Sequence, residues 1–342
     1  MSYPFDLQIA WWVLVGVLLI GYAILDGFDL GVGILYLFSK TDQQRRILLN
    51  AIGPVWDGNE VWLIVGGGAL FAAFPDVYAT VFSGFYTPFM LLLTALIFRA
   101  VAIEFRSKRE SPKWRARWDA SFSVASLLIA LLTGVALGNI ALGIPLDAQH
   151  EYVGGFFNLL NPYALIMGIT TVALFSLHGA IYTVLKTEGE LQEMAKKWMF
   201  GCVIFFAFFY IVLTMSTFLF VPHMVENFRT NPALLVVPFT HLLVLFNIPR
   251  EIYRRREMSA FFMSSLNIAL LLVLFGIGTF PNIVLSMPDP ENSLTIQNAS
   301  SSPASLTIMF TIALLGMPFV VAYTTAVYWV FRGKVDPRAL HY

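Results

Sequence analysis

Six ionisable side chains interrupt otherwise apolar stretches in the first third of the 342-residue chain. They are Asp26 and Asp29 in GYAILDGFDLGVG, Asp57 and Glu60 in GPVWDGNEVW, and Arg99 and Glu104 in LIFRAVAIEFRSK. The two members of each acidic pair are three residues apart, which places them on one face of a helix. A carboxyl group in apolar surroundings can load and release a proton, so the pattern is typical of a proton pathway.

The composition around these acids indicates a membrane. Hydrophobic residues make up 58% of the chain and charged residues 12%, whereas soluble domains carry about 25% charged residues. The single cysteine, Cys202, excludes a disulfide scaffold. The 21 basic and 21 acidic residues balance, which leaves no basic field for nucleic acid. We therefore expect an all-α integral membrane protein with no nucleic-acid partner.

A membrane-spanning helix needs about 20 mostly apolar residues. Nine stretches meet this need, at residues 8–38, 50–74, 77–106, 117–142, 161–186, 196–221, 232–249, 258–286 and 304–332. If these spans alternate in direction, all of the 21 basic residues except Arg99 and Arg229 fall in loops on one side. Cytoplasmic loops are rich in Lys and Arg, so we expect the N-terminus outside and the C-terminus in the cytoplasm.

In this arrangement the six ionisable residues lie toward the cytoplasmic half of the first three spans. One interpretation is a proton-uptake path in which Asp57 and the Asp26/Asp29 pair carry protons. Another is a buried salt-bridge network in which Arg99 neutralises Asp57 and the chain acts as a scaffold. A third, of a different class, is a proton-coupled secondary transporter that uses Asp26, Asp29 and Asp57.

A weak internal similarity indicates how the spans group. The end of the first span, LDGFDLGVGILYLFSKT, is similar to the end of the fifth, LHGAIYTVLKT. A four-span repeat would give units at residues 1–145 and 146–290, with the ninth helix and the C-terminal tail at 291–342. Seven glycines of the first two spans are expected to let helices approach closely. They are Gly21, Gly27, Gly31, Gly33, Gly66, Gly67 and Gly68.

The histidines give little support for a metal or haem site in this chain. Only His178 and His241 lie within predicted spans. Haem in a helical bundle takes His or Met ligands from facing helices, but nothing in this spacing requires one. No cysteine pair is present for zinc or an iron–sulfur cluster. We expect no metal ligand in the chain.

Long segments of the sequence resemble one known family. They are WWVLVGVLLIGYAILDGFDLGVG, RRILLNAIGPVWDGNEVWLIVGGGALFAAFPDVYATVFSGFYTPFMLLLTALIFRAVAIEFRSK, KWRARWDASF, GVALGNIALGIP and FFNLLNPYAL. Through them the chain resembles subunit II of cytochrome bd quinol oxidase. The resemblance implies nine transmembrane helices, arranged as two four-helix bundles plus one peripheral helix, in a bacterial or archaeal cell (inner) membrane.

The resemblance also implies a division of labour between two subunits. The partner, subunit I, carries two b-type haems, the d-type haem and the quinol site, and subunit II ligates no haem. Together the subunits oxidise quinol and reduce dioxygen to water, with protons taken from the cytoplasm. A small single-helix accessory subunit and lipids are further expected partners.

The most specific motif surrounds Asp57. It matches the family's acidic residue that is linked to proton conduction, and Trp56, Gly58 and Asn59 complete the motif. Glu60 stands where some relatives carry glutamine, so the resemblance assigns it no proton role.

The remaining candidates lie on the first and third spans. Asp26 and Asp29 match the aspartates of the family's first-span motif, and Arg99 matches its third-span arginine. The predicted proton pathway therefore comprises Asp57, Asp29, Asp26 and Glu104. The expected supporting residues are Arg99, Trp56, Asn59 and Glu60.

Overall fold

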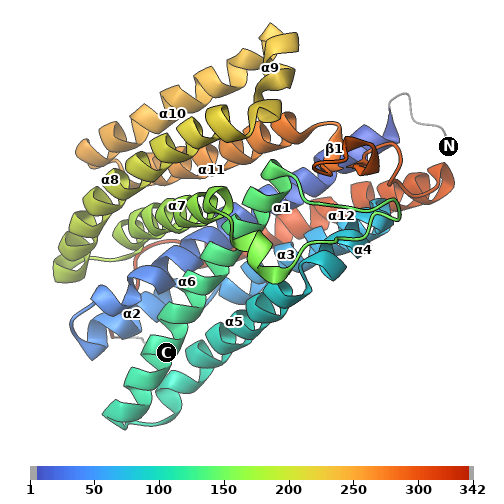
Figure 1. Ribbon diagram of the computed structural model, residues 1–342. Helices are drawn as coiled ribbons and strands as arrows, with labels where there is room; N and C mark the ends of the chain where they lie inside the picture. Colours follow the sequence, from blue (N-terminus) through green and yellow to red (C-terminus); the bar gives the residue numbers. More distant parts are fainter. Residues whose placement is uncertain (1–5, 339–342) are drawn as a thin grey trace.

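The computed structural model describes residues 6–338, and almost all of them are helical (Figure 1). The long helices are α1 (Leu7–Leu35), α3 (Trp56–Ala73), α5 (Tyr86–Phe105), α6 (Pro112–Leu142), α7 (Pro162–Lys186), α8 (Gly189–Phe220), α10 (Val236–Tyr253), α11 (Glu257–Thr279) and α12 (Pro303–Val330). The short elements are α2 (Asp42–Ile52), α4 (Pro75–Gly84), α9 (Glu226–Thr230) and the antiparallel strands β1 (Asn282–Val284) and β2 (Leu294–Thr295). The expected all-α membrane fold is confirmed. Residues 1–5 and 339–342, at the ends of the first and last predicted units, lie outside the described residues.

The predicted number of nine spans is not confirmed. Within residues 6–338, eight helices are long and apolar enough to cross a membrane: α1, α5, α6, α7, α8, α10, α11 and α12. The stretch predicted at 50–74 contains the last turn of α2, a break at residues 53–55 and the 18-residue helix α3. Pro54 has no backbone N–H to continue the hydrogen bonds of α2, and Val55 leaves the helical conformation. Asp57 and Glu60 then place two charged residues in the first turns of the short helix α3.

Two further predicted spans are longer than the helices that form. In the stretch predicted at 77–106, residues 75–84 belong to the separate short helix α4, and α5 begins only at Tyr86. In the stretch predicted at 258–286, α11 ends at Thr279 and residues 282–284 form β1. Pro281 has no backbone N–H to continue a helix, which explains the second difference.

Helix α7 lies at the centre of the molecule, between α1, α6, α8 and α11. Its contact with α1 is made by backbone against backbone. A Cβ added at Gly31 would lie 1.9 Å from the carbonyl oxygen of Phe175, and one at Gly179 would lie 2.4 Å from the α1 backbone. Small residues permit such close approach between membrane helices. The packing role expected for Gly31 is therefore confirmed.

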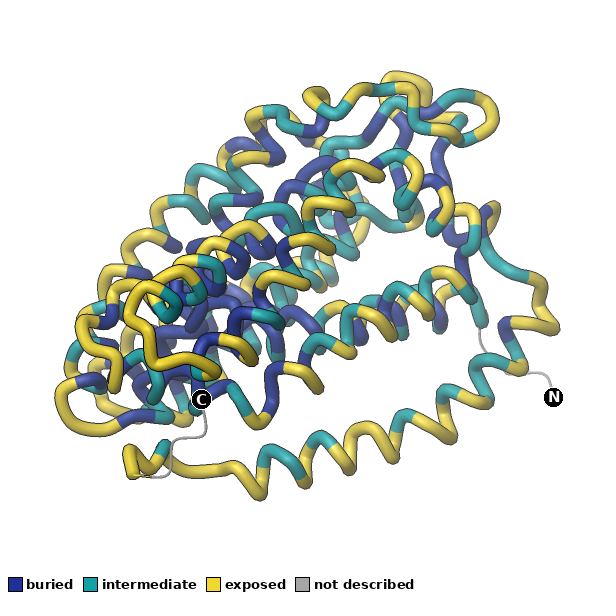
Figure 2. The backbone as a smooth tube through the Cα atoms, turned by 90° about the horizontal axis from the view of Figure 1, so that it is seen from below, coloured by how far each residue is buried: buried dark blue, intermediate teal, exposed yellow. Residues whose placement is uncertain are grey.

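Helix α12 lies at the edge of the molecule. Leu306 is its one buried residue, and the helix is exposed along nearly all its length (Figure 2). It contacts α1 and α3. On α3, Gly67 and Gly68 have no atom within 4 Å of an added Cβ, so the expectation that they pack against another helix of this chain is wrong. The division into units at residues 145 and 290 stays a prediction. Helices α1 and α7 belong to different predicted units, yet they pack closely against each other.

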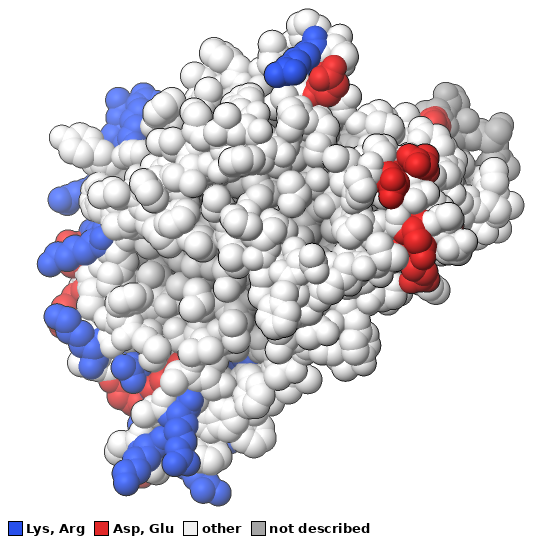
Figure 3. Space-filling view, viewed as in Figure 1, with Lys and Arg blue, Asp and Glu red and all other residues white. Residues whose placement is uncertain are grey.

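Charged residues separate between the two ends of the helices. Lys and Arg gather at one end of the face in Figure 3, and Asp and Glu predominate at the opposite end. We call the first the basic end; its loops and helix ends contain Arg45, Lys108, Lys197, Arg254 and Lys334. The described chain starts at the opposite end and finishes at the basic end (Figure 1). This matches the separation of basic residues expected from the loops.

The α1–α7 contact predicts a large difference between two Gly→Ala substitutions on one helix. Gly31→Ala inserts a methyl group into the α7 backbone and should destabilise the protein by about 1–3 kcal/mol or more. Gly16→Ala is the matched control, because an added Cβ there meets no atom within 4 Å. Thermal unfolding of the detergent-solubilised protein measures both. Equal unfolding temperatures for the two variants would contradict the close contact.

Candidate functional site

Asp26 on α1 and Arg99 on α5 form an ion pair that is completely buried. Arg99 Nη2 donates to Asp26 Oδ1 at 2.6 Å, and Nη1 donates to Oδ2 at 3.1 Å. Two parallel bonds of this kind match the planar guanidinium to the carboxylate and are the strongest form of the interaction. Breaking such a buried pair leaves an uncompensated charge, so it holds α1 and α5 in one relative position.

Glu60 on α3 is the second partner of Arg99. Its Oε1 accepts a hydrogen bond from Arg99 Nη1 at 2.6 Å, and 19% of its side chain is exposed. The hypothesis that Arg99 neutralises Asp57 is therefore wrong in detail. Arg99 instead joins α1, α3 and α5 through Asp26 and Glu60.

Asp29 is buried one turn beyond Asp26 on α1. Its Oδ2 accepts a hydrogen bond from Asn59 Nδ2 at 2.7 Å, whereas its Oδ1 has no hydrogen-bond partner among the described residues. Asn59 Oδ1 in turn accepts from the hydroxyl of Tyr328 on α12, at 2.8 Å. Sequence reasoning missed Tyr328, because a tyrosine 269 positions from its partner carries no local signal.

The structure brings four of the six predicted ionisable residues together. We call Asp26, Asp29, Glu60 and Arg99 the acid–arginine cluster. Asp57 and Glu104 instead are exposed on the surfaces of α3 and α5, and neither forms a hydrogen bond or ion pair through its side chain within residues 6–338. Trp56, next to Asp57, is buried in the hydrophobic core.

The cluster holds more acids than bases. Arg99 supplies one positive charge, whereas Asp26, Asp29 and Glu60 could supply three negative charges. Excess negative charge in a low-dielectric interior is expensive, and protonation of a carboxyl group removes it. The arrangement is therefore able to hold a proton. Among the described residues no group of three or more His, Cys, Asp or Glu side chains is placed to bind a metal.

A second charged network, which sequence reasoning also missed, lies at the basic end. Its members are Tyr36, Asp42, Arg45, Arg106, Arg115 and Asp119. Asp119 accepts hydrogen bonds from Tyr36, Arg45 and Arg106, so it ties the start of α6 to the ends of α1 and α5. Partial burial opposes ionisation of Asp42, but its hydrogen bond and charge interaction with Arg106 outweigh this and lower the pKa of the carboxyl group. This network fixes α2, from which the chain enters α3.

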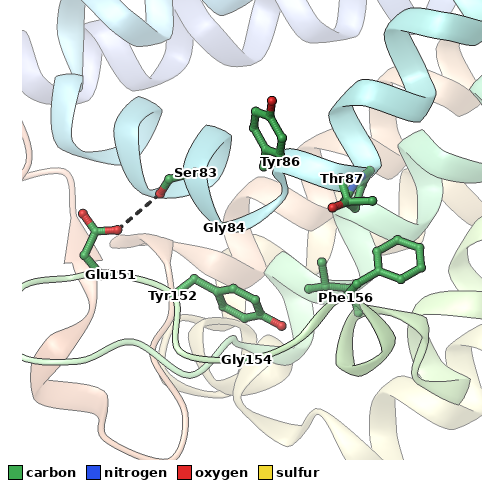
Figure 4. Close-up of a pocket in the computed structure, with 10 residues that line it drawn as sticks. Ser83, Gly84, Tyr86, Thr87, Glu151, Tyr152, Gly154 and Phe156 are labelled. Carbon is green, nitrogen blue, oxygen red and sulfur yellow. Dashed lines mark hydrogen bonds between the residues drawn. The ribbon is translucent and has the colours of Figure 1, made fainter.

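A cavity of about 280 Å³ lies beyond the other end of α3, between α4 and the segment that precedes α7 (Figure 4). Glu151 and Tyr152 line one side, and Ser83 donates a hydrogen bond to Glu151 Oε2 at 3.4 Å. The 18 residues of α3 rise about 27 Å, so this cavity is remote from Asp57. It contains none of the candidate residues.

The ion pair predicts a strong thermodynamic coupling. Asp26→Asn and Arg99→Gln, made singly, should each lower the free energy of unfolding by about 3–5 kcal/mol, because each leaves a buried charge without its doubly bonded partner. The double variant should lose less than the sum of the two losses. Unfolding in detergent measures the cycle, with exposed Arg250→Gln as a control. Strictly additive losses would show that the two side chains do not depend on each other.

Comparison with known proteins places this arrangement in a family. The sequence matches the family described as "Cytochrome bd terminal oxidase subunit II" over residues 7–331. It is 36% identical over 360 residues to "Cytochrome bd-I ubiquinol oxidase subunit 2" of Escherichia coli strain K12, covering 96% of this chain and 95% of the relative. It is also 36% identical over 334 residues to "Cytochrome bd ubiquinol oxidase subunit 2" of Bacillus subtilis strain 168, covering 96% of each.

A solved structure has the same fold. A chain of the bd oxidase from Geobacillus thermodenitrificans superposes with a TM-score of 0.79 at 16% sequence identity, covering 96% of this chain and 99% of that chain. The sequence matches extend over nearly the whole chain and include the acid–arginine cluster and Asp57. The chain therefore belongs to the cytochrome bd terminal oxidase subunit II family.

Proposed function

We propose that this chain is the subunit of a quinol:dioxygen oxidoreductase that supports the haem-bearing subunit I and supplies it with protons. The observation that carries the proposal is the placement of Asp57. It is an exposed acid in the first turn of α3, one helical turn from the buried acid–arginine cluster, and α3 starts at the basic end.

The exposed surface around Asp57 supports a protein partner there. A carboxylate facing lipid is expensive and needs a protein or aqueous neighbour. On α3, Gly58, Gly67 and Gly68 leave open space, and glycines of this kind let another helix approach closely. Ile64, between them, is 72% exposed. We assign this surface of α3 to contact with subunit I, so that Asp57 would lie at the boundary between the subunits.

The histidines support placing haem b and haem d in subunit I. Both ring nitrogens of His178 are engaged, one with Ser264 Oγ at 2.9 Å and one with the carbonyl oxygen of Ile24 at 3.1 Å. Those of His241 contact Tyr210 and Asn267. A haem ligand needs a free ring nitrogen directed at the iron. The buried histidines of this chain do not fit that role, and the quinol site would also belong to the partner.

Asp57 and Glu104 would connect this arrangement to the cytoplasm. The positive-inside rule assigns the basic end to the cytoplasm, and both acids lie near that end, on α3 and α5. Protons from the cytoplasm would reach Asp57 at the subunit boundary, with Asp26 and Asp29 as buried acids behind it. We therefore place the protein in a bacterial or archaeal cell membrane, with its basic end in the cytoplasm. A small accessory subunit and lipids would complete the complex.

The topology can be checked directly. A reporter that fluoresces only in the cytoplasm should be active when fused after the C-terminus, because the end of α12 lies at the basic end. The same reporter fused before the N-terminus should be inactive. The reverse pattern would place the basic end outside and contradict proton uptake from the cytoplasm through Asp57.

The role of Asp57 predicts a loss of turnover without a loss of cofactor. In the assembled complex, Asp57→Asn should lower quinol-driven oxygen consumption by about 100-fold, the lower range for one positioned proton-transfer group, while the haem absorption spectrum is retained. Asp76→Asn is the matched control, because Asp76 is also exposed at the second residue of a helix, on α4. It should not alter turnover.

Three other outcomes would contradict the proposal. Normal turnover in Asp57→Asn would exclude Asp57 from proton delivery. Loss of the haem spectrum would make Asp57 an assembly residue and favour the scaffold hypothesis. A colourless purified protein that moved a solute with protons would favour the secondary transporter.

A further inference from the structure

The acid–arginine cluster contains one carboxyl group that differs from the others. Asp26 is 0% exposed, the side chain of Glu60 is 19% exposed, and Asp57 lies at the surface one turn before Glu60 on α3. Burial therefore increases stepwise from Asp57 through Glu60 to Asp26. Glu60 is the member of this series that contacts both the surface and the buried arginine.

We propose that Glu60 is a proton-loading residue that exchanges protons with Asp57, so that the Asp57 carboxylate is reprotonated from inside this subunit. This inference rests on the proposed proton supply through Asp57 and adds a second carrier to it. Glu60 is the acid for which the family resemblance assigned no proton role.

The hydrogen bonds around Arg99 explain why Glu60 can change its charge. Asp26 receives two bonds from the guanidinium, through Nη1 and Nη2, whereas Glu60 receives one, from Nη1. If Glu60 takes up a proton, Arg99 keeps its doubly bonded partner and stays compensated. If Asp26 took up the proton instead, the buried arginine would lose its strongest partner. Of the two acids that bond to Arg99, Glu60 can therefore take up a proton with less disturbance of the buried ion pair than Asp26.

The second carboxyl oxygen of Glu60 is available for the exchange. Glu60 Oε1 accepts from Arg99, whereas Oε2 forms no hydrogen bond within the described part of the chain. Asp57 and Glu60 are three residues apart and share one helix face, so their carboxyl groups are neighbours. The proton would move from one carboxyl group to the other directly or through a water molecule, and no other bond changes.

Charged and titratable groups of three helices surround Glu60. Arg99 on α5 carries the charge opposite to that of an ionised Glu60, whereas Asp26 on α1 and Asp57 on α3 carry the same charge as it does. Tyr22 and Asp29, also on α1, are fully buried and interact electrostatically with Glu60. From α12, Tyr328 donates a hydrogen bond to the neighbouring Asn59 and interacts electrostatically with Asp29 and Asp26. One cation therefore faces several acids, and a neutral Glu60 relieves their repulsion.

The test is Glu60→Gln in the assembled complex. Glutamine keeps a carbonyl oxygen that can accept the bond from Arg99, but it cannot carry a proton. Turnover should fall by roughly tenfold or more at alkaline pH, where protons are scarce, and by less than about twofold at acidic pH. The haem spectrum and the unfolding temperature should not change. Glu110→Gln, an exposed Glu near the basic end, is the matched control and should show the parental pH profile.

The outcomes separate this inference from the proposal on which it rests. If Asp57→Asn lowers turnover but Glu60→Gln leaves it unchanged at every pH, Glu60 carries no proton and the Asp57 pathway stands. If neither variant changes turnover, both ideas fail. An equal loss at every pH in Glu60→Gln, with a lower unfolding temperature, would make Glu60 a structural partner of Arg99 and overturn the inference. Restored alkaline turnover in Glu60→Asp would support it.

Discussion

The buried ion pair between Arg99 and Asp26 is the interaction on which the rest of the site depends. A guanidinium held in an apolar helix bundle needs a carboxylate, and Asp26 satisfies it with two hydrogen bonds. That requirement links α1 to α5 through these side chains, and the bond from Nη1 to Glu60 links α3 to the same guanidinium. The surplus acids then lie around a single positive charge. The capacity to hold a proton follows from this imbalance.

The site is divided between a buried part and an exposed part. The buried acids are held by neighbours within this chain, including Asn59, which connects Asp29 to Tyr328 on the peripheral helix α12. Asp57, by contrast, is exposed on α3. A division of this kind suits a subunit that works within a complex, because the exposed acid would gain its surroundings only when another protein covers it.

Much of the fold could be predicted from the sequence, because long apolar stretches and the distribution of basic residues depend on composition alone. The shared depth of Asp26, Glu60 and Arg99 could also be predicted from their spacing. The pairing could not. Membrane helices are apolar on all sides, so the sequence does not indicate which way each helix is rotated. For this reason the sequence suggests Asp57 as a partner of Arg99, whereas the structure gives that contact to Glu60.

Other differences have equally local causes. Pro54 and Pro281 shorten two predicted spans, because proline has no N–H donor to continue a helix. The contact between Tyr328 and Asn59 joins residues 269 positions apart, and nothing in either local sequence indicates it. By residue type, Gly67 and Gly68 cannot be told from glycines that pack against a helix, but in the structure they face open space. Their neighbours would have to come from another chain, which no single sequence contains.

Infrared difference spectroscopy of the assembled oxidase tests the central claim most directly, because a protonated carboxyl group absorbs in a region separate from that of a carboxylate. The account predicts a carboxylic-acid band that changes when the complex is reduced, shifts in heavy water and disappears when the acids beside Arg99 are replaced by their amides. Absence of any such band from this cluster would mean that none of its carboxyl groups gains or loses a proton. They would then be fixed salt-bridge partners, and the cluster would have no part in proton transfer.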